Sequence, residues 1–260
     1  METTGGHECA LLGYLEGKSI AAHRGNARTI KNFIRSLRNY GKTDKIDALA
    51  IAQYGSERHQ NLELYKAPSE SLRKLTAFNR RRSELVKMRT ADKNRLEGPM
   101  SADIADSLKR VIKALDTEIE RIEKQIEKLV QQDKALSAKA EVMQTIPGIG
   151  KITAMGILSY LPAIGSFTRR EIASLSGVAP HPYDSGDQQS YRSTRGGKKE
   201  IKPILFIAAM AASRGKHSLG VYYRRKIAEG KKPIVALTAL MRKIIVIANA
   251  RVRDLQGAQS

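Results

Sequence analysis

One run of apolar side chains constrains the fold of this chain more than any other feature. Between residues 104 and 129 the apolar positions alternate between steps of three and four, with one stutter between Leu115 and Ile119. They are Ile104, Leu108, Val111, Leu115, Ile119, Ile122, Ile126 and Leu129. This spacing places a single apolar stripe along an α-helix, while charged residues occupy its other faces. The run therefore predicts one long amphipathic helix.

A second helix is predicted just before it. Ser69 is a suitable N-cap after Pro68, and apolar residues then recur at helical spacing. These residues are Leu72, Leu75, Phe78, Leu85 and Met88. Gly98-Pro99 separates the two helices, because neither residue continues a helix well. Two interpretations remain open: an antiparallel or dimeric coiled coil, and a helical arm with no partner.

The charge of the chain indicates a polyanionic partner. Its 260 residues include 46 Lys and Arg against 26 Asp and Glu, a formal net charge of +20. Neutralising phosphates releases counterions and dominates affinity for nucleic acids. A membrane surface is the weaker alternative, since the basic residues are spread along the whole chain. Cys9 is the single cysteine, no apolar run reaches transmembrane length, and no signal peptide is evident, so we expect a cytoplasmic, nucleoid-associated protein.

The first 58 residues have the pattern of a small α/β piece. We expect helices at 6–15, 27–38 and 44–54 and a short strand at 19–22. Thr43 is placed to cap the third helix, which begins with Asp44 and carries Asp47 one turn later. Two carboxylates at this spacing share a helix face and are suited to Mg²⁺. The alternative is a pair of solvated acids in a first helical turn, where acids are favoured.

Residues 141–260 have the pattern of a mainly helical unit that opens on a helix-hairpin-helix turn. Pro147-Gly148-Ile149-Gly150 is followed by Lys151 at the expected start of a helix. Glycines there let backbone N–H groups approach a phosphate, and the helix dipole favours an anion. Gly148, Gly150 and Lys151 are therefore candidate contacts to a DNA backbone. A tight helix–helix turn with no ligand is the alternative.

Further along, Tyr183-Asp184-Ser185-Gly186 precedes a strongly basic stretch. The cations that follow are Arg192, Arg195, Lys198 and Lys199. A serine hydroxyl needs orientation, deprotonation and nearby positive charge before it attacks a phosphodiester. Ser185 is the candidate nucleophile, and the four cations are candidate phosphate ligands. Ser-Gly pairs also form ordinary turns, which is the alternative here.

Taken in order, these motifs resemble the DEDD-type insertion-sequence transposases of the IS110 family. The match rests on Glu2-Thr3-Thr4-Gly5, the stretch from Lys42 to Ala48, the turn at 147–150 and the Ser185 motif. The resemblance implies α/β plus α architecture in three parts. These are a partial RuvC-like (RNase H-like) domain at 1–58, a coiled-coil hairpin at 59–140 and a mainly helical transposase domain with a helix-hairpin-helix at 141–260.

The resemblance also implies roles for individual residues. Glu2, Asp44 and Asp47 match metal ligands for Mg²⁺, and Ser185 matches the serine that links covalently to DNA. The implied partners are DNA, at the element ends and the target, a guide RNA and further copies of the chain. The family's first metal-binding Asp lies upstream of the position that Glu2 matches, so the chain has the pattern of an N-terminally shortened copy. Residues 24–25 read Arg-Gly where the family commonly has Asn-Pro.

Three functions follow from these features. The first is a transposase that cleaves and exchanges DNA strands through Ser185, with Ser190 and Ser193 as the next candidate nucleophiles. The second is a non-catalytic remnant of such an enzyme that binds DNA or RNA. The third is a structure-specific repair nuclease that uses metal-activated water. A covalent protein–DNA adduct separates the first function from the other two.

Overall fold

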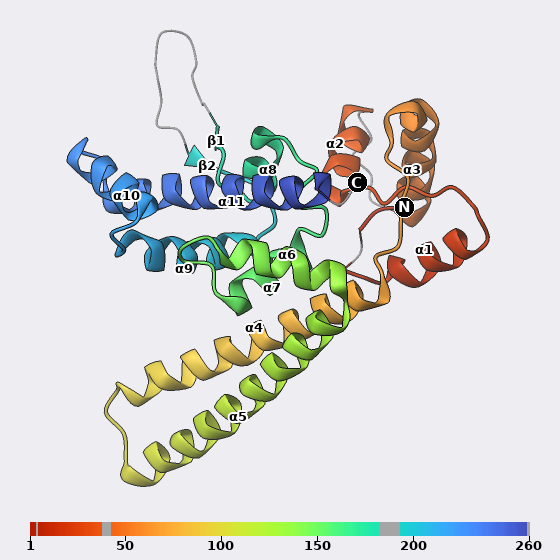
Figure 1. Cartoon of the computed structure of the whole chain (residues 1–260). Helices are drawn as coiled ribbons and strands as arrows, with labels where there is room; N and C mark the ends of the chain where they lie inside the picture. Colours follow the sequence, from red (N-terminus) through yellow and green to blue (C-terminus); the bar gives the residue numbers. More distant parts are fainter. Residues whose placement is uncertain (4, 38–42, 182–192, 259–260) are drawn as a thin grey trace. The chain divides into compact units, whose positions relative to one another are not determined.

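The computed structural model describes residues 1–3, 5–37, 43–181 and 193–258, and most of these residues are helical. Two compact units divide the chain, Met1–Ser69 and Glu70–Ser260 (Figure 1). The predicted domains 59–140 and 141–260 lie mainly within the second unit.

The first unit consists of short helices. Its elements are α1 (Glu8–Gly17), α2 (Ala27–Ser36), α3 (Asp44–Arg58) and a 3₁₀ turn, η1 (His59–Asn61). The predicted cap is confirmed, because the Thr43 hydroxyl accepts a hydrogen bond from the Ile46 N–H at 3.3 Å. The strand predicted at 19–22 is wrong: these residues form the turn after α1 and an irregular segment. Glu2 pairs with Gly25 in an isolated parallel bridge that is not part of a strand. This single bridge does not test the predicted RuvC-like sheet, which stays a prediction.

The second unit begins with an antiparallel helical hairpin. Helix α4 (Glu70–Leu96) packs along α5 (Ala102–Gln132), and the Gly98-Pro99 break separates them as predicted (Figure 1). Two ion pairs join the helices, Arg82 Nε to Glu123 Oε1 and Arg89 to Asp116 Oδ1, both at 2.6 Å. The two helices therefore pair within one chain.

The apolar seam of α5 differs from the predicted stripe at both ends. Leu115, Ile119, Ile122 and Ile126 are buried as expected. Toward the N-terminus Ile112 is buried and Val111 is exposed, and toward the C-terminus Val130 is more deeply buried than Leu129. A straight helix has 3.6 residues per turn, so a stripe spaced at 3.5 drifts away from a fixed partner over this length. On α4, Met88 is likewise exposed where the pattern predicted burial.

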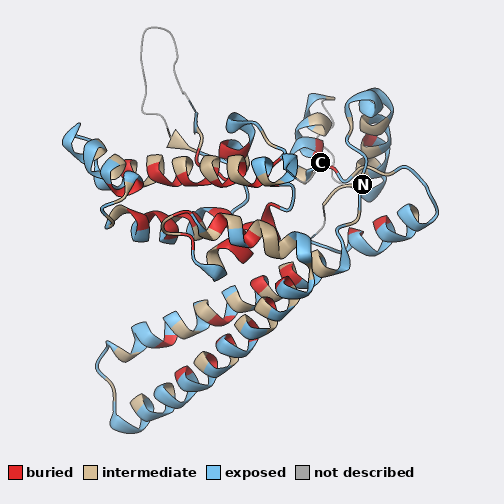
Figure 2. Cartoon of the chain, viewed as in Figure 1, coloured by how far each residue is buried: buried red, intermediate tan, exposed pale blue. Residues whose placement is uncertain are grey.

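The remaining elements form a helical domain around α11 (Pro233–Gly257). They are α6 (Lys134–Gln144), α7 (Lys151–Tyr160), α8 (Arg169–Leu175), β1 (Pro180–His181), β2 (Ser193–Thr194), α9 (Ile201–Ser213) and α10 (Ser218–Ala228). Helix α11 packs against α6, α8, α9 and α10, and its apolar residues are buried along much of its length (Figure 2). Helices α9 and α11 contact one another, and the small residues Ala208 and Ala209 of α9 and Ala248 of α11 are buried.

By length and composition, α11 is also apolar enough to span a membrane, contrary to the sequence expectation. Several of its most apolar residues, including Leu240, Ile244 and Ile245, are buried in the domain core. Its hydropathy is that of a central core helix.

Candidate nucleic-acid interface

The turn between α6 and α7 is held tightly against α9. Gly148 adopts a positive φ of 92°, and a Cβ there would lie 2.3 Å from the Ala208 carbonyl oxygen. Ile146 and Ile149, on either side of the turn, are buried. Packing alone therefore requires glycine at position 148.

The first residues of α7 lie at the surface. Gly150 is the N-cap residue with extended backbone, and no side chain caps the helix. Lys151 is exposed, with its Nζ 3.6 Å from Glu127 Oε1, a distance at which an exposed pair contributes little to stability. Backbone N–H groups at such a helix start favour an anion.

A two-stranded ribbon follows α8. Pro180 pairs with Thr194, and His181 pairs with Ser193, in antiparallel register. Residues 182–192 connect the two strands and lie outside the described residues. Three predicted residues fall in that segment, namely the nucleophile Ser185, its alternative Ser190, and Arg192.

The basic turn after β2 includes one lysine with a structural task. The Lys198 backbone N–H donates to the Leu175 carbonyl at 2.8 Å, and its Nζ donates to the Tyr160 carbonyl at 2.6 Å. Lys198 thus joins the ends of α7 and α8, where the helix dipole attracts a cation. Arg195 and Lys199 are exposed. Lys198 therefore stabilises the turn as well as adding charge.

A groove of about 1370 Å³ lies beside this ribbon and turn. Its walls come from β1, β2, the turn after β2, α9, α10, α11 and the α10–α11 connection. Among the described residues that line it, five are basic and none is Asp or Glu. The basic residues are Lys198, Lys199, Lys202, Lys231 and Arg242. The groove is therefore suited to an anion.

Three of these cations were missed by the sequence analysis. Lys202 lies on α9, where its Nζ donates to Thr194 Oγ1 at 3.1 Å, while Lys231 and Arg242 belong to the segment that leads into and forms α11. Lys202 was visible as the next cation after Lys199 in the basic stretch. No sequence signal places Lys231 and Arg242 beside it, because they are far along the chain.

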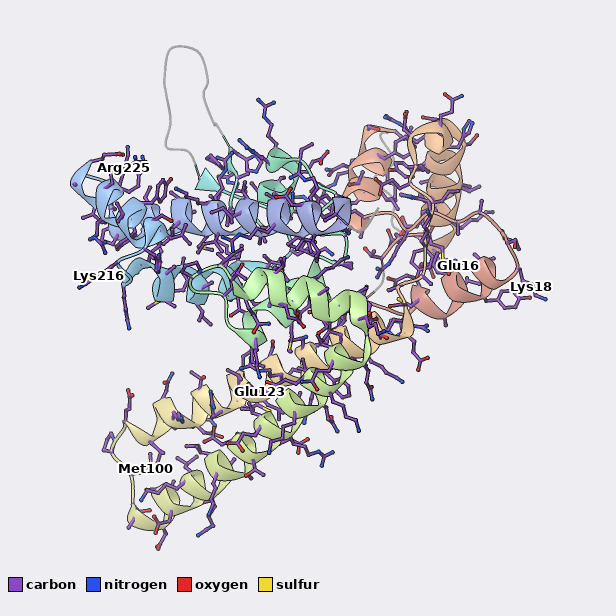
Figure 3. The ribbon with its side chains drawn as sticks, viewed as in Figure 1. Glu16, Lys18, Met100, Glu123, Lys216 and Arg225 are labelled. Carbon is purple, nitrogen blue, oxygen red and sulfur yellow. The ribbon has the colours of Figure 1, made fainter. Side chains whose placement is uncertain are left out.

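Positive charge also surrounds an aromatic ring of the groove. Tyr222 lines it from α10, and Lys243 Nζ lies 4.3 Å from the Tyr222 ring centroid. Arg225 and Lys226 lie 5.4 and 5.8 Å from the same centroid. Figure 3 shows Arg225 at the α10 end of the domain. Cation–π attraction thus concentrates charge near this wall.

The predicted metal ligands lie in the first unit. Glu2 lines a hollow of about 490 Å³ together with His7 and Glu8, but the hollow reaches α3 through Ala48 and Ile51, not through Asp44 or Asp47. Glu8 is engaged by Arg24, whose Nε donates to Glu8 Oε1 at 3.0 Å. Within the described ranges, no group of three His, Cys, Asp or Glu side chains is arranged to hold a metal ion. Glu2, Asp44 and Asp47 as ligands of a Mg²⁺ ion therefore stay a prediction from the family resemblance.

One titratable group near the basic turn is perturbed. Burial raises the pKa of Tyr160, and the negative charge of Glu200 raises it further. The folded chain therefore favours the neutral phenol, consistent with a position in the core rather than in phosphate chemistry.

Two separate parts of this chain match families of transposases. Residues 1–102 match a family described as Transposase, of the IS110 DEDD type, and residues 140–224 match the Transposase IS116/IS110/IS902 family.

Individual relatives agree with these matches. A pilin gene-inverting protein of Moraxella lacunata is 30% identical over 233 residues, covering 88% of this chain and 71% of the relative. The insertion element IS110 uncharacterized 43.6 kDa protein of Streptomyces coelicolor is 30% identical, covering 74% of this chain and 51% of the relative. The transposase for insertion sequence element IS1111A of Coxiella burnetii is 23% identical, with coverages of 76% and 61%.

Proposed function

Because the chain belongs to the IS110 family of transposases, we propose that it breaks and rejoins DNA strands at the basic groove through the Ser185 hydroxyl. It is an insertion-sequence transposase, and DNA is its partner. The names of its relatives describe gene inversion and transposition, and both processes rearrange DNA.

One observation carries this proposal. The strand residues on either side of the Ser185 segment, Pro180, Ser193 and Thr194, line the groove that gathers five cations and no described acid. A nucleophile for phosphodiesters works best where positive charge meets the charge that develops on phosphate oxygens. The groove thus combines this charge with the flanks of the Ser185 segment.

The proposed reaction keeps the energy of the broken phosphodiester bond in a covalent link between Ser185 and the DNA. Ser185 Oγ forms a bond to phosphorus, its proton passes to a base or to solvent, and one phosphorus–oxygen bond of the DNA breaks. The leaving oxygen takes up a proton and becomes a free hydroxyl. A hydroxyl of another strand then attacks the phosphoserine and restores Ser185, so strands are exchanged without an outside energy source.

Several cations have proposed roles around this step. Lys199, Lys202 and Arg242 balance phosphate charge, together with Arg192 and Arg195. We propose that Gly150 and Lys151 act as a helix-hairpin-helix contact, holding the DNA backbone at the start of α7.

Three further points stay predictions from the family resemblance. They are the binding of Mg²⁺ by Glu2, Asp44 and Asp47, the binding of a guide RNA, and self-association of the chain.

A covalent-adduct assay tests the proposal. The wild-type chain is incubated with a supercoiled plasmid carrying both ends of its insertion sequence, and denaturing gels detect protease-sensitive DNA adducts. We expect Ser185→Ala to lower adduct formation at least about a thousandfold while DNA binding is unchanged. Ser190→Ala is the matched control and should keep the adduct. If Ser185→Ala still forms it, Ser185 is not the nucleophile and Ser190 and Ser193 become the candidates.

A further inference from the structure

The basic groove has a second chemical character that phosphate binding does not explain. Apolar side chains form much of its lining, from α9 and α11 in particular. They include Phe206, Ile207, Ile234, Val235 and Met241. Ile207 is 65% exposed and Ile234 is 57% exposed. Exposed apolar surface of this extent beside lysines indicates a ligand with both an apolar face and negative charge.

Duplex DNA does not present such a combination, because its stacked bases expose only their edges in the grooves and hide their faces. An unpaired nucleotide does present it, since an unstacked base exposes an apolar π-face next to its own phosphate. The groove volume of about 1370 Å³ also exceeds the roughly 300–1,000 Å³ typical of small-ligand pockets. It therefore has room for a base with its sugar and phosphate.

We propose that this groove binds an unpaired nucleotide of the DNA substrate, with its base against Phe206, Ile207 and Ile234 and its phosphate beside Lys202 and Arg242. This inference rests on the proposed function and names the form of DNA that the site takes. An unpaired nucleotide next to the reacting phosphate would leave that phosphate accessible, because base stacking no longer fixes the backbone around it.

The combination of positive charge and apolar lining favours a nucleotide over an acidic peptide as the occupant of the groove. Its five cations come from the turn after β2, from α9, from the α10–α11 connection and from α11. Positive charge therefore lies on several sides of the apolar lining. The cations that gather around the Tyr222 ring add to this field. A nucleotide supplies a flat apolar face and a phosphate within one unit, which matches that arrangement.

Three DNA probes of one sequence test the inference with the full chain. The first is a continuous duplex, the second carries a single unpaired base, and the third carries an abasic residue at the same bulge. Fluorescence anisotropy at one fixed salt concentration measures each Kd. We expect the bulged base to bind about tenfold more tightly than the abasic bulge, because stacking and apolar contact are lost with the base.

Two variants connect that difference to the groove. Ile207→Asn and Ile234→Asn change exposed side chains, so we expect both to fold and to lose most of the tenfold preference, measured as the ratio of the Kd values for the abasic and bulged probes. Ile104→Asn is the matched control, because Ile104 is 56% exposed on α5 and does not line the groove. Lys202→Gln should weaken binding to all three probes. It should also make the slope of log K against log salt concentration shallower by about one unit, because one phosphate contact is lost.

The outcomes separate this inference from the proposed function. Binding of duplex with no preference between bulged and abasic DNA overturns the inference and leaves the proposed function standing. Preference that survives in both isoleucine variants also overturns it, because the base would then bind elsewhere. Failure to bind any of the three probes would instead contradict the DNA-binding role itself. Displacement of the bulged probe by an acidic peptide at equal concentration would assign the groove to a protein ligand and overturn the inference.

Discussion

Residues 1–69 and residues 70–260 bury their apolar side chains to very different extents. Among described residues, the buried hydrophobics of the first unit are Leu12, Ile30 and Ala50, whereas Leu11, Tyr14, Ile20, Leu49 and Leu64 are large and exposed. The second unit has a continuous core that runs from α4 through α11. Burying one Leu or Ile side chain contributes about 1.5–3 kcal/mol, so packing stabilises the second unit far more.

The difference concerns function as well as stability. The basic groove, the flanks of the Ser185 segment and the start of α7 all belong to the well-packed unit. The predicted metal ligands belong to the other unit, where the described acids do not converge. A site that positions a nucleophile needs rigid support, and the core of residues 70–260 supplies it.

The largest expected effect comes from truncating the core of the second unit. Ile244 is fully buried on α11, so Ile244→Ala should lower the free energy of unfolding by about 2–5 kcal/mol. Leu12→Ala removes an equally buried side chain from the first unit and should leave that main transition unchanged. Urea denaturation followed by far-UV circular dichroism measures both. An equal shift in the two variants would show that the units unfold together and would remove the contrast.

A smaller effect is expected within the α6–α7 turn. Gly148→Ala places a methyl group against the Ala208 carbonyl at a positive φ, which should cost about 2–4 kcal/mol. Gly150→Ala is the matched control, since its backbone is extended and a Cβ there meets no atom within 4 Å. It should cost no more than about 1 kcal/mol, because alanine is a poorer N-cap than glycine but meets no steric clash there. Thermal unfolding compares the pair, and equal destabilisation would contradict the packing role of Gly148.

The smallest effect is a pH dependence confined to the second unit. Because the pKa of Tyr160 is raised in the folded chain, the unfolded chain ionises first as the pH rises past about 10. Stability from this group is therefore complete below pH 10 and is lost above it. Tyr160→Phe should lose less stability than wild type between neutral and strongly alkaline pH. Parallel stability profiles for the two proteins would show that Tyr160 is not responsible.

The sequence by itself determined the features that depend on local pattern. The spacing of Leu115, Ile119, Ile122 and Ile126 predicted α5, and Gly98-Pro99 predicted the break between the two long helices. The family also followed from motifs in the order of the chain. Helix periodicity, capping and charge are properties of neighbouring residues, so they need no knowledge of the fold.

Only the tertiary structure decided what depends on distant segments. It buried Ile112 in place of Val111, because a straight helix drifts from its 3.5-residue pattern. Gly148 has no side chain and so leaves room for α9 to pack against the α6–α7 turn. Lys198 donates hydrogen bonds to carbonyl groups at the ends of α7 and α8. The tertiary structure also brought Lys202, Lys231 and Arg242 to one groove. Packing between helices fixes these positions. The local sequence pattern around each residue does not show which helices contact one another.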